Sequence, residues 1–432
     1  MRTHGITLVA LAMLAAVAGC ASVPEVPDGP DDPLPRHLAQ QRALDGAPHL
    51  AGNRVAFLSN GGEAFPAMFR AIAEARDHVN LEFYILQDVR APGMDGTSLF
   101  ALLAAKLRQG VQVSLIHDGL GSSDTPDEAF EALRRLGART LAYHPVDPLK
   151  ARRGWLPNNR DHRKILIVDG RVAFTGGINM DRVYENPCGA QAAGYAVDED
   201  HARACWHDTA VRIEGPAVAE LQRMFLGNWT AQGGPPLPPR DWFPALPQAG
   251  DAEVQVLGSD PAERRPLFYR TLLTALDGAR ERIWLSTGFF VPTHLERKAL
   301  ARAVRRGVDV RLVLPSFTDS RLALAAGHAA YDDLLSAGVR IFEVRDAVLH
   351  SKLAVVDGVW TGIGSSNFDH RSVALNAEVD CIILGRQAAS EAEAKLSAEM
   401  RKAPEVTLSD WRQRPLGARL HESYARLWTD LL

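Results

Sequence analysis

Two copies of one segment decide the fold of this chain: HRKILIVDG at residues 162–170 and HSKLAVVDG at residues 350–358. After the same interval, each copy is followed by a small-residue turn that ends in asparagine, GGIN at residues 176–179 and GSSN at residues 364–367. The copies align without a gap at an offset of 188 residues. A repeat of this kind indicates two structural units of the same type within one chain.

The sequence before each copy repeats as well. Strand-like and helix-like segments alternate in the same order, and helical patterns stop at equivalent glycines, Gly110 and Gly137 in the first unit, Gly307 and Gly338 in the second. This alternation predicts an α/β fold with two pseudo-symmetric lobes, each a mixed sheet flanked by helices, and one active site between them.

The domain boundaries follow from composition. A chain of 432 residues with 46% hydrophobic residues is long enough for two domains. Proline and glycine crowd residues 233–250, and proline and aspartate are frequent in residues 20–50. We therefore expect a flexible tether at 20–50, a first lobe at 51–232, a proline-rich linker at 233–250 and a second lobe at 251–432.

The repeated residues have a chemistry in common. The histidine and lysine of each copy are two residues apart, so both side chains point to the same face of a strand. Two imidazoles, two ammonium groups and two amides around one anionic centre suit a phosphodiester, whose charge grows in the transition state. One imidazole can attack phosphorus while the other protonates the leaving alcohol. The candidates are His162, Lys164, Asn179, His350, Lys352 and Asn367. Because the lysines neutralise charge, we expect neither a metal nor another cofactor.

A plainer explanation exists for each copy. A single histidine near a lysine is usually a surface or core residue without a catalytic role, and a duplicated fold can repeat such residues through ancestry alone. Ancestry does not explain why His, Lys and Asn are retained in both copies while Leu, Ile and Val interchange around them. The pattern therefore favours catalysis.

Taken together, these residues resemble the doubled HxKxxxxD signature of the phospholipase D superfamily, over nearly the whole chain after residue 50. The resemblance sharpens towards the bacterial cardiolipin synthases, although Phe289 stands where their pattern has a tyrosine. It is carried by NRDHRK at 159–164, WHD at 206–208, FFVP at 289–292, RS at 371–372 and LNAE at 375–378.

The resemblance implies a role for each imidazole. His162, in the first motif, would be the nucleophile that forms a phosphohistidine intermediate, and His350 would be the general acid and base. An acid should orient each ring, Glu378 for His350 and Asp208 for His162.

The remaining signature residues would bind substrate or complete the motif. Lys164, Lys352, Asn179 and Asn367 would bind the non-bridging oxygens, while Gly177 and Ser365 would bring the turns close to the substrate. Asp169 and Asp357 complete the catalytic signature, and a structural role at the strand turn stays open for both.

The implied reaction transfers a phosphatidyl group between two phosphatidylglycerol molecules and releases glycerol. Hydrolysis, with water as the acceptor, is the first alternative, and an inactive lipid-binding scaffold is the non-enzymatic one. The net charge of −4 argues against a nucleic-acid partner.

The N-terminus predicts export. An apolar run of about 13 residues is too short to span a membrane, which takes roughly 20, so residues 1–19 fit a signal peptide better. The run ends in VAGC at 17–20, which resembles a bacterial lipobox with lipidation at Cys20. Ala21 then favours the periplasmic side of the outer membrane. An ordinary signal peptide and an uncleaved anchor are the alternatives.

Two further features bear on the surroundings of the protein. Cys188 could pair with Cys205 in an exported chain, whereas Cys381 reads as a buried strand residue. Residues 149–156 mix cations with Trp155 and could contact anionic headgroups, although a solvated basic loop explains them equally well.

Overall fold

The computed structural model describes residues 30–431, except residues 45, 148, 150–154, 157, 187, 189–203, 262, 264 and 319. The predicted signal peptide at 1–19, Cys20 and the centre of the predicted basic loop therefore lie outside the described residues. Within the described ranges, no helix is long and apolar enough to cross a membrane.

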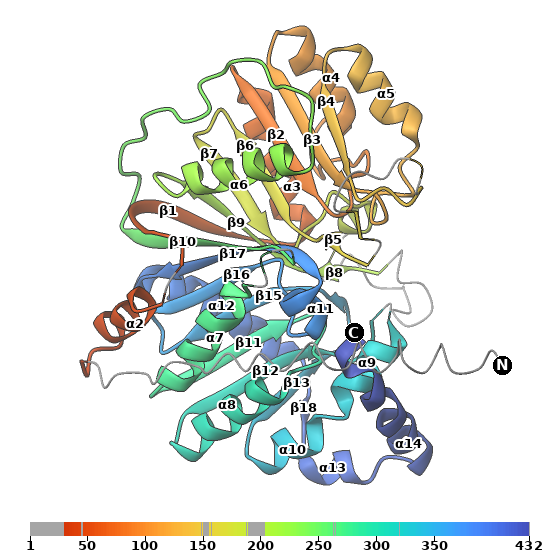
Figure 1. The fold of residues 1–432 in the computed structure, drawn as a ribbon. Helices are drawn as coiled ribbons and strands as arrows, with labels where there is room; N and C mark the ends of the chain where they lie inside the picture. The colour runs from red at the N-terminus through yellow and green to blue at the C-terminus, as the bar shows by residue number, and fades with distance from the viewer. Residues whose placement is uncertain are drawn as a thin grey trace, which may run out of the picture.

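The first lobe alternates strands and helices along the chain (Figure 1). Its strands are β1 (His49–Ser59), β2 (His78–Phe83), β3 (Gln112–Asp118), β4 (Arg139–Tyr143), β5 (Arg160–Asp161), β6 (Lys164–Val168), β7 (Val172–Gly176), β8 (Trp206–His207) and β9 (Thr209–Glu214). Its helices are α3 (Asn60–Glu74), α4 (Leu99–Arg108), α5 (Asp127–Arg135), the 3-10 helix η2 (Arg182–Glu185) and α6 (Val218–Ala231).

The second lobe repeats this order and adds a C-terminal extension. Its strands are β10 (Ala252–Ser259), β11 (Arg282–Thr287), β12 (Asp309–Pro315), β13 (Arg340–Val344), β14 (Val348–Leu349), β15 (Lys352–Val356), β16 (Trp360–Gly364), β17 (Asn376–Leu384) and β18 (Glu405–Val406). Its helices are α7 (Leu267–Gly278), α8 (His294–Arg305), α9 (Arg321–His328), α10 (Tyr331–Ser336), α11 (His370–Ala374), α12 (Arg386–Lys402), α13 (Leu408–Arg412), α14 (Leu416–Ala425) and η4 (Arg426–Leu431).

Both lobes belong to one continuous sheet. Its order is β18-β13-β12-β11-β15-β16-β17-β10-β1-β9-β7-β6-β2-β3-β4, and repeat-equivalent strands stand at equal distances from the central β10–β1 pair. Strands β2, β3 and β4 run parallel to one another, as do β11, β12 and β13, and the motif strands β6 and β15 are antiparallel to their neighbours. The prediction of two pseudo-symmetric α/β lobes with mixed sheets is confirmed.

The motif strands are buried on both faces. Along β6, Ile165 and Ile167 pack in the same core cluster as α6, whereas Leu166 and Val168 pack in the cluster that contains α3. Because successive strand residues point to opposite faces, helices cover both sides of this strand. Each motif therefore starts from a rigid, dry support.

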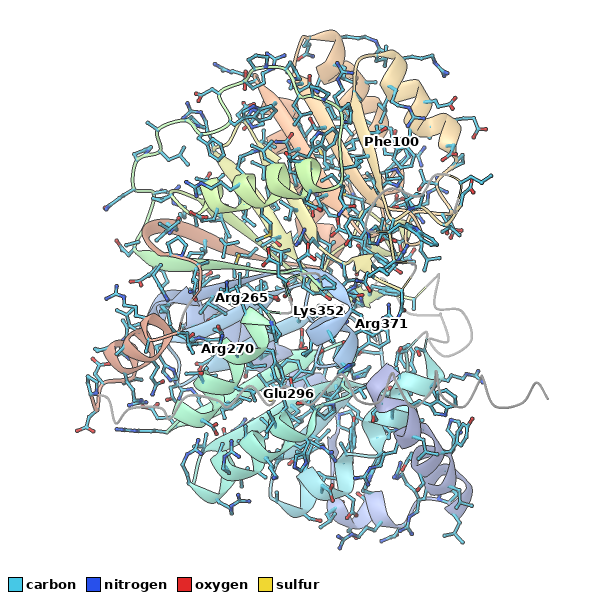
Figure 2. All side chains as sticks on the ribbon, viewed as in Figure 1. Phe100, Arg265, Arg270, Glu296, Lys352 and Arg371 are labelled. Carbon is cyan, nitrogen blue, oxygen red and sulfur yellow. A yellow bond between two sulfur atoms is a disulfide. The ribbon has the colours of Figure 1, made fainter. Side chains whose placement is uncertain are left out.

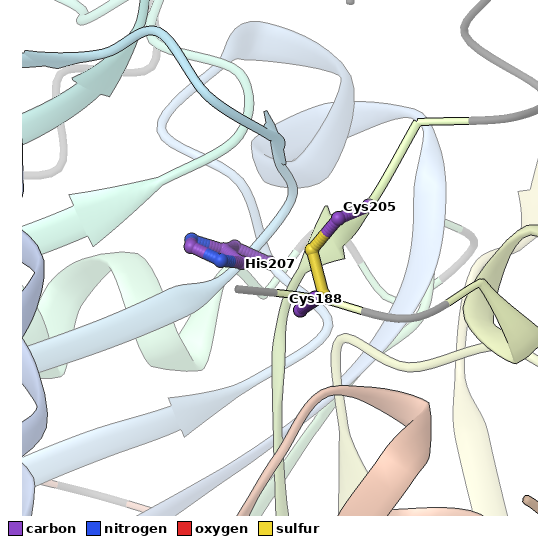
Figure 3. Close-up of side chains that lie close together, drawn as sticks. All are labelled: Cys188, Cys205 and His207. Carbon is purple, nitrogen blue, oxygen red and sulfur yellow. A yellow bond between two sulfur atoms is a disulfide. The ribbon is translucent and has the colours of Figure 1, made fainter. Parts of the chain in front are cut away.

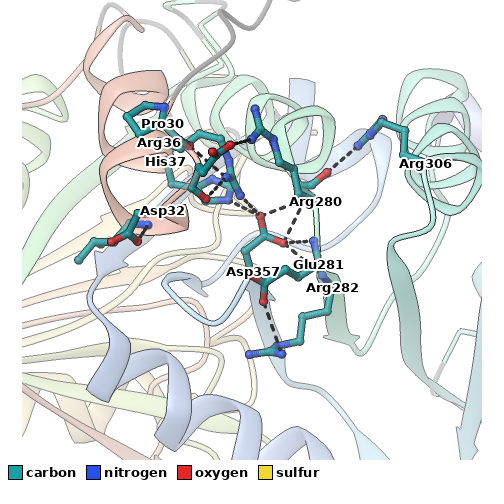
Figure 4. A network of polar contacts seen from close by, with 12 residues as sticks. Pro30, Asp32, Arg36, His37, Arg280, Glu281, Arg282, Arg306 and Asp357 are labelled. Carbon is teal, nitrogen blue, oxygen red and sulfur yellow. Dashed lines mark hydrogen bonds and ion pairs between the residues drawn. The ribbon is translucent and has the colours of Figure 1, made fainter.

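The N-terminal segment corrects the domain prediction. Residues 33–42 form helix α2 (Pro33–Arg42), with Asp32 capping its start, and residues 49 onward already belong to β1. Arg36 and His37 are buried, and both contact the carboxylate of Asp357 at 2.8 and 3.1 Å (Figure 4). The flexible tether expected over 20–50 is therefore wrong for residues 33–42 and for the first residues of β1.

Candidate active site

Both histidines line one cavity at the junction of the two lobes. The cavity has a volume of about 300 Å³ and draws residues from both halves of the chain. His162, His350, Asn179 and Asn367 are among the lining residues. Segments that lie 188 positions apart in the sequence thus meet around one space.

The motif lysines lie beneath the cavity rather than in its lining. Lys164 is 1% exposed and Lys352 is 4% exposed, so their ammonium groups are shielded from water. Each ammonium donates to the carbonyl oxygen of the histidine two residues earlier, over 2.6 Å for Lys164. Burial, with a contribution from the nearby Lys352, lowers the pKa of Lys164 to about 7, although Glu378 opposes the shift.

The acids that orient the imidazoles are exchanged relative to the sequence prediction. Nδ1 of His162 lies 3.0 Å from Oε2 of Glu378, and Nδ1 of His350 lies 2.7 Å from Oδ2 of Asp208. The prediction had paired each acid with the histidine of its own half, and that assignment is wrong. Each ring uses Nδ1 for a carboxylate of the opposite lobe, which leaves Nε2 for chemistry.

Strand register explains the exchange. Gly176 of β7 pairs with Ala210 of β9, and Gly364 of β16 pairs with Asp380 of β17, so the two acids occupy equivalent positions two residues earlier. The start of β17 also pairs with β5, and β8 pairs with β14. Each acid is therefore carried by a segment that crosses to the histidine of the other lobe.

The two carboxylates are held by different groups. The Ser365 hydroxyl donates to Glu378 over 2.5 Å, and the Asn376 amide donates to the same carboxylate over 3.3 Å. On the other side, the Tyr184 hydroxyl donates to Asp208 over 2.7 Å and lies 3.0 Å from Nδ1 of His350. Tyr184 was not predicted, because the equivalent position in the second half is Ser372 and the repeat therefore does not mark the tyrosine.

Two predicted substrate-binding residues have another role in the structure. Ser365 holds Glu378, and a methyl group placed on Gly177 would overlap Oδ1 of Asp208. Neither residue lines the cavity. Both residues therefore support the orienting acids, and their contact with substrate stays a prediction.

The two signature asparagines do line the cavity. Oδ1 of Asn179 accepts from the backbone amide of Ile85 over 3.2 Å, which fixes the side chain so that its NH₂ is the group left for a ligand. In Asn367 it is Oδ1 that is buried and has no hydrogen-bond partner among the described residues. Both residues stay candidates for contact with phosphate oxygens.

The signature aspartates lie at the far ends of the motif strands. Asp169 accepts hydrogen bonds from the backbone amides of Arg76, Asp77 and His78 over 2.8–2.9 Å, and Asp357 does the same for residues 280–282. Both have positive φ, 53° and 50°, and begin a tight turn completed by glycine. Strand β6 separates Asp169 from Lys164 by roughly 16 Å, at about 3.3 Å per residue.

A catalytic assignment of Asp169 and Asp357 is therefore corrected to a structural one, the alternative that the sequence had left open. A network around Asp357 is shown in Figure 4. Burial alone would raise the pKa of this carboxyl, but His37 and the surrounding amides outweigh burial and lower it.

Burial controls the charge of both imidazoles. It lowers the pKa of His162 to about 4, with a further contribution from Lys164, while Glu378 opposes the shift. Burial and the neighbouring Lys352 likewise lower the pKa of His350. Without an anionic ligand both rings are neutral near pH 7, the state in which an imidazole nitrogen can act as a nucleophile or base.

Aromatic rings line the walls around the imidazoles. The Tyr84 ring lies 5.2 Å from that of His162, and Trp206 and Phe289 lie 5.6 and 6.4 Å from that of His350. Such walls exclude water and strengthen electrostatic interactions inside the cavity. Sequence patterns had marked Trp206 and Phe289 only as parts of motifs.

A disulfide lies next to the second half-site. Cys188 and Cys205 are bonded, with Cα atoms 5.0 Å apart, and His207 lies close by (Figure 3). The carbonyl groups of Cys205 and His207 accept from Val348 and His350, so this segment runs directly beside the second motif. Cys381 is fully buried in β17, as expected.

Comparisons with known proteins agree with this geometry. The family described as "Cardiolipin synthase, PLD-like domain" matches residues 68–186 and 272–400. Cardiolipin synthase A of Pseudomonas putida (strain GB-1) is 35% identical over 396 residues, which are 90% of this chain and 77% of the relative. Cardiolipin synthase of Geobacillus kaustophilus is 31% identical over 390 residues, 89% of this chain and 74% of the relative.

A solved structure shares the fold. The crystal structure of phosphatidylserine synthase from Haemophilus influenzae has a TM-score of 0.62 to this chain, at 14% sequence identity, and the match covers 92% of this chain and 98% of that one. At this identity the likeness concerns architecture alone. The two-lobed arrangement thus occurs in at least one other solved protein.

Proposed function

Because the chain belongs to the cardiolipin synthase family of phospholipase D-like proteins, we propose that it makes cardiolipin by moving a phosphatidyl group from one phosphatidylglycerol to another. The observation that carries the proposal is the single cavity in which both imidazoles present Nε2, each with a carboxylate at Nδ1. This arrangement supplies a nucleophile and a separate acid–base group for one phosphorus atom.

In the first step, Nε2 of His162 attacks the phosphorus of the donor lipid. The bond from phosphorus to the headgroup oxygen breaks, and His350 gives its proton to that oxygen, so glycerol leaves. The negative charge of the bound phosphodiester favours the protonated form of His350 that this step requires.

In the second step, a hydroxyl of the acceptor's glycerol headgroup attacks the phosphorus. His350 takes the hydroxyl proton, the bond between phosphorus and His162 breaks, and both rings return to their starting states. Because one group serves as acid and then as base, a single His350 suffices for both half-reactions.

The lysines and asparagines act on the charge of the phosphoryl group. Lys164 and Lys352 lie buried next to each other below the imidazoles, where their charges are poorly screened. We infer that a bound phosphate draws their ammonium groups from the histidine carbonyls to its non-bridging oxygens. Asn179 donates from the side. This fixed set of donors stabilises the transition state.

The acceptor lipid brings a second phosphate into the cavity. Among the described residues, two guanidinium groups line the cavity, and Arg160 is already paired with Asp118 at 3.4 Å. Arg371 instead donates to the side-chain and backbone oxygens of Asn158, both at 3.1 Å, and has no ion pair among the described residues. Arg371 is therefore our candidate for the acceptor phosphate. Figure 2 labels it near the junction of the lobes.

The proposal is tested with purified protein and phosphatidylglycerol labelled in one acyl chain, followed by separation of the lipids. Labelled cardiolipin together with free glycerol supports transfer. Phosphatidic acid without cardiolipin would replace transfer by hydrolysis, and absence of any turnover contradicts both. Arg371→Gln should lower the ratio of cardiolipin to phosphatidic acid, while Arg270→Gln on α7 should leave the ratio unchanged.

We also propose that the protein is exported and anchored through a lipid on Cys20. The Cys188–Cys205 disulfide supports an oxidising compartment, since structural disulfides are rare in the cytosol. Incorporation of labelled palmitate into the wild-type chain, and its loss in Cys20→Ala, would support the anchor. Equal labelling of both chains would refute it.

A further inference from the structure

The C-terminal helix presents large apolar side chains to solvent next to the active-site cavity. Five residues of α14 and η4 are involved, and we call them the α14 face. They are Leu416, Leu420, Tyr424, Leu427 and Trp428, exposed by 73, 71, 54, 79 and 39%. Leu416, Leu420, Tyr424 and Trp428 are spaced by four residues and Leu427 follows Tyr424 by three, which places all five along one side of a helix.

The opposite side of the same helix packs behind the wall of the cavity. Ala425 is fully buried in a cluster with Val291 and Ala323, and both of these residues line the cavity. Helix α14 packs on α9, and η4 contacts α9 and α11. Figure 1 shows α14 beside α9 at the edge of the second lobe. Apolar side chains thus reach outward from a helix whose inner side supports the site.

Cations accompany the apolar residues. Arg419 and Arg426 lie on the same segment and have no ion pair among the described side chains, whereas Arg414 is paired with Glu422. Leucine with tyrosine and tryptophan on one side, and arginine beside them, is the composition of helices that lie in a membrane interface. Unpaired arginines also attract anionic headgroups.

We propose that the α14 face docks on an anionic lipid bilayer and delivers phosphatidylglycerol to the cavity from that surface. The inference rests on the proposed function, because it takes the substrate to be a bilayer lipid. A lipid whose headgroup enters the cavity keeps its acyl chains at the opening, so an apolar surface beside the site can stay in the membrane during catalysis. The occupant is a lipid surface rather than a second copy of the chain, because the arginines complement its negative charge.

The kinetic test compares two substrates of the full chain. The Leu420→Ser/Leu427→Ser variant should raise the apparent KM for phosphatidylglycerol in vesicles by about tenfold, because it removes apolar surface from the interface. Turnover of a monomeric, short-chain phosphatidylglycerol should stay within about twofold of wild type, since the cavity is intact. The matched control is Leu136→Ser/Leu295→Ser, whose leucines are 38 and 37% exposed elsewhere on the surface.

A second measurement does not depend on turnover. Brominated lipids in phosphatidylglycerol vesicles should quench part of the tryptophan emission of the full chain, and Trp428→Phe should remove that part. Unchanged vesicle kinetics in the double serine variant would overturn docking by this face, as would quenching that is identical in Trp428→Phe. If the double serine variant turns over both substrates more slowly by the same factor, the lipid quenching of Trp428 decides whether the α14 face docks on the bilayer.

Failure of the two proposals can be told apart. If the wild-type protein turns over neither substrate, the proposed function is contradicted. The quenching of Trp428 by brominated lipids then still tests whether the α14 face docks on the bilayer. A change of oligomeric state in the serine variant, without any change on vesicles, would assign the face to self-association and refute the membrane proposal.

Discussion

The two half-sites start from the same strand pair and end with different surroundings for their imidazoles. His162 is oriented by a glutamate that a serine and an asparagine hold, whereas His350 is oriented by an aspartate that a tyrosine holds. The position after the first turn glycine is Gly177 in one half and Ser365 in the other, and both serve the acids. Equivalent positions have thus taken different residues for one purpose.

The functional unit of the site is therefore the imidazole–carboxylate pair formed across the two lobes, and not the sequence repeat. Each histidine takes its backbone from one lobe and its acid from the other, so neither lobe contains a complete imidazole–carboxylate pair. Asymmetry between the pairs is what two different tasks require, nucleophilic attack by one ring and proton transfer by the other.

The largest expected effect comes from removing either imidazole. His162→Ala and His350→Ala should each lower cardiolipin formation by about 10⁴-fold or more, because groups that act as a unit lose most of their effect together. The double variant should be scarcely slower than either single variant. A variant with a near-normal rate would break the claim that both rings serve one phosphorus atom.

The exchanged acids give the next largest effect and sharpen the comparison. Glu378→Gln and Asp208→Asn should each lower the rate by about 10²–10⁴-fold, because an amide no longer selects the productive ring tautomer. Rapid-quench kinetics should show slow formation of the intermediate in both variants, because the first step needs His162 as the nucleophile and His350 as the acid. Normal formation of the intermediate in either variant would contradict the role given to that acid.

The signature aspartates should affect stability rather than chemistry. Asp357→Asn leaves Arg36 buried without its charge partner and should cost about 3–5 kcal/mol of unfolding free energy, measured with urea. Asp169→Asn, which loses only amide contacts, should cost about 1–3 kcal/mol.

The pH dependence of the Asp357 contribution has a definite sign. The folded pKa of Asp357 lies below its unfolded value of about 3.9, so the stability it supplies is present above that pH and is lost as the pH falls further. The gap between wild type and Asp357→Asn should therefore shrink below about pH 4. A constant gap would contradict a charged Asp357.

The smallest effects should come from the residues that support the acids. Ser365→Ala removes one hydrogen bond to Glu378. The reaction should slow by about tenfold, because a hydrogen bond of this kind contributes roughly 1.4 kcal/mol. Gly177→Ala should slow it at least as much, because the added methyl group displaces Asp208. Equal rates for wild type and both variants would show that neither acid needs this support.

The lobes and the paired motifs could be predicted from the sequence, because they follow from the local alternation of strand and helix patterns and from the equal spacing of the motif residues. The sequence could not predict the exchange of acids, since 29 residues separate Asn179 from Asp208 but only 11 separate Asn367 from Glu378. Equivalence becomes visible only through the pairing of β9 with β7 and of β17 with β16.

Tertiary contacts explain the other differences. The sequence predicts a tether over residues 33–42, because these residues are mostly polar and follow a stretch that is rich in proline. Arg36 and His37 nevertheless find a buried carboxylate 320 positions away or more, which fixes the helix on the second lobe. Tyr184 lies in a segment that has a counterpart in the second half, but the equivalent position there is Ser372, so the repeat could not mark the tyrosine as functional.

The most direct test locates the covalent intermediate. Wild type and both histidine variants are mixed with labelled phosphatidylglycerol, quenched in denaturant at neutral pH, digested and analysed by mass spectrometry. We expect a phosphatidyl group on the peptide that contains His162, and none in His162→Ala. A phosphatidyl group on His350, or turnover of the wild type without any adduct, would contradict the account.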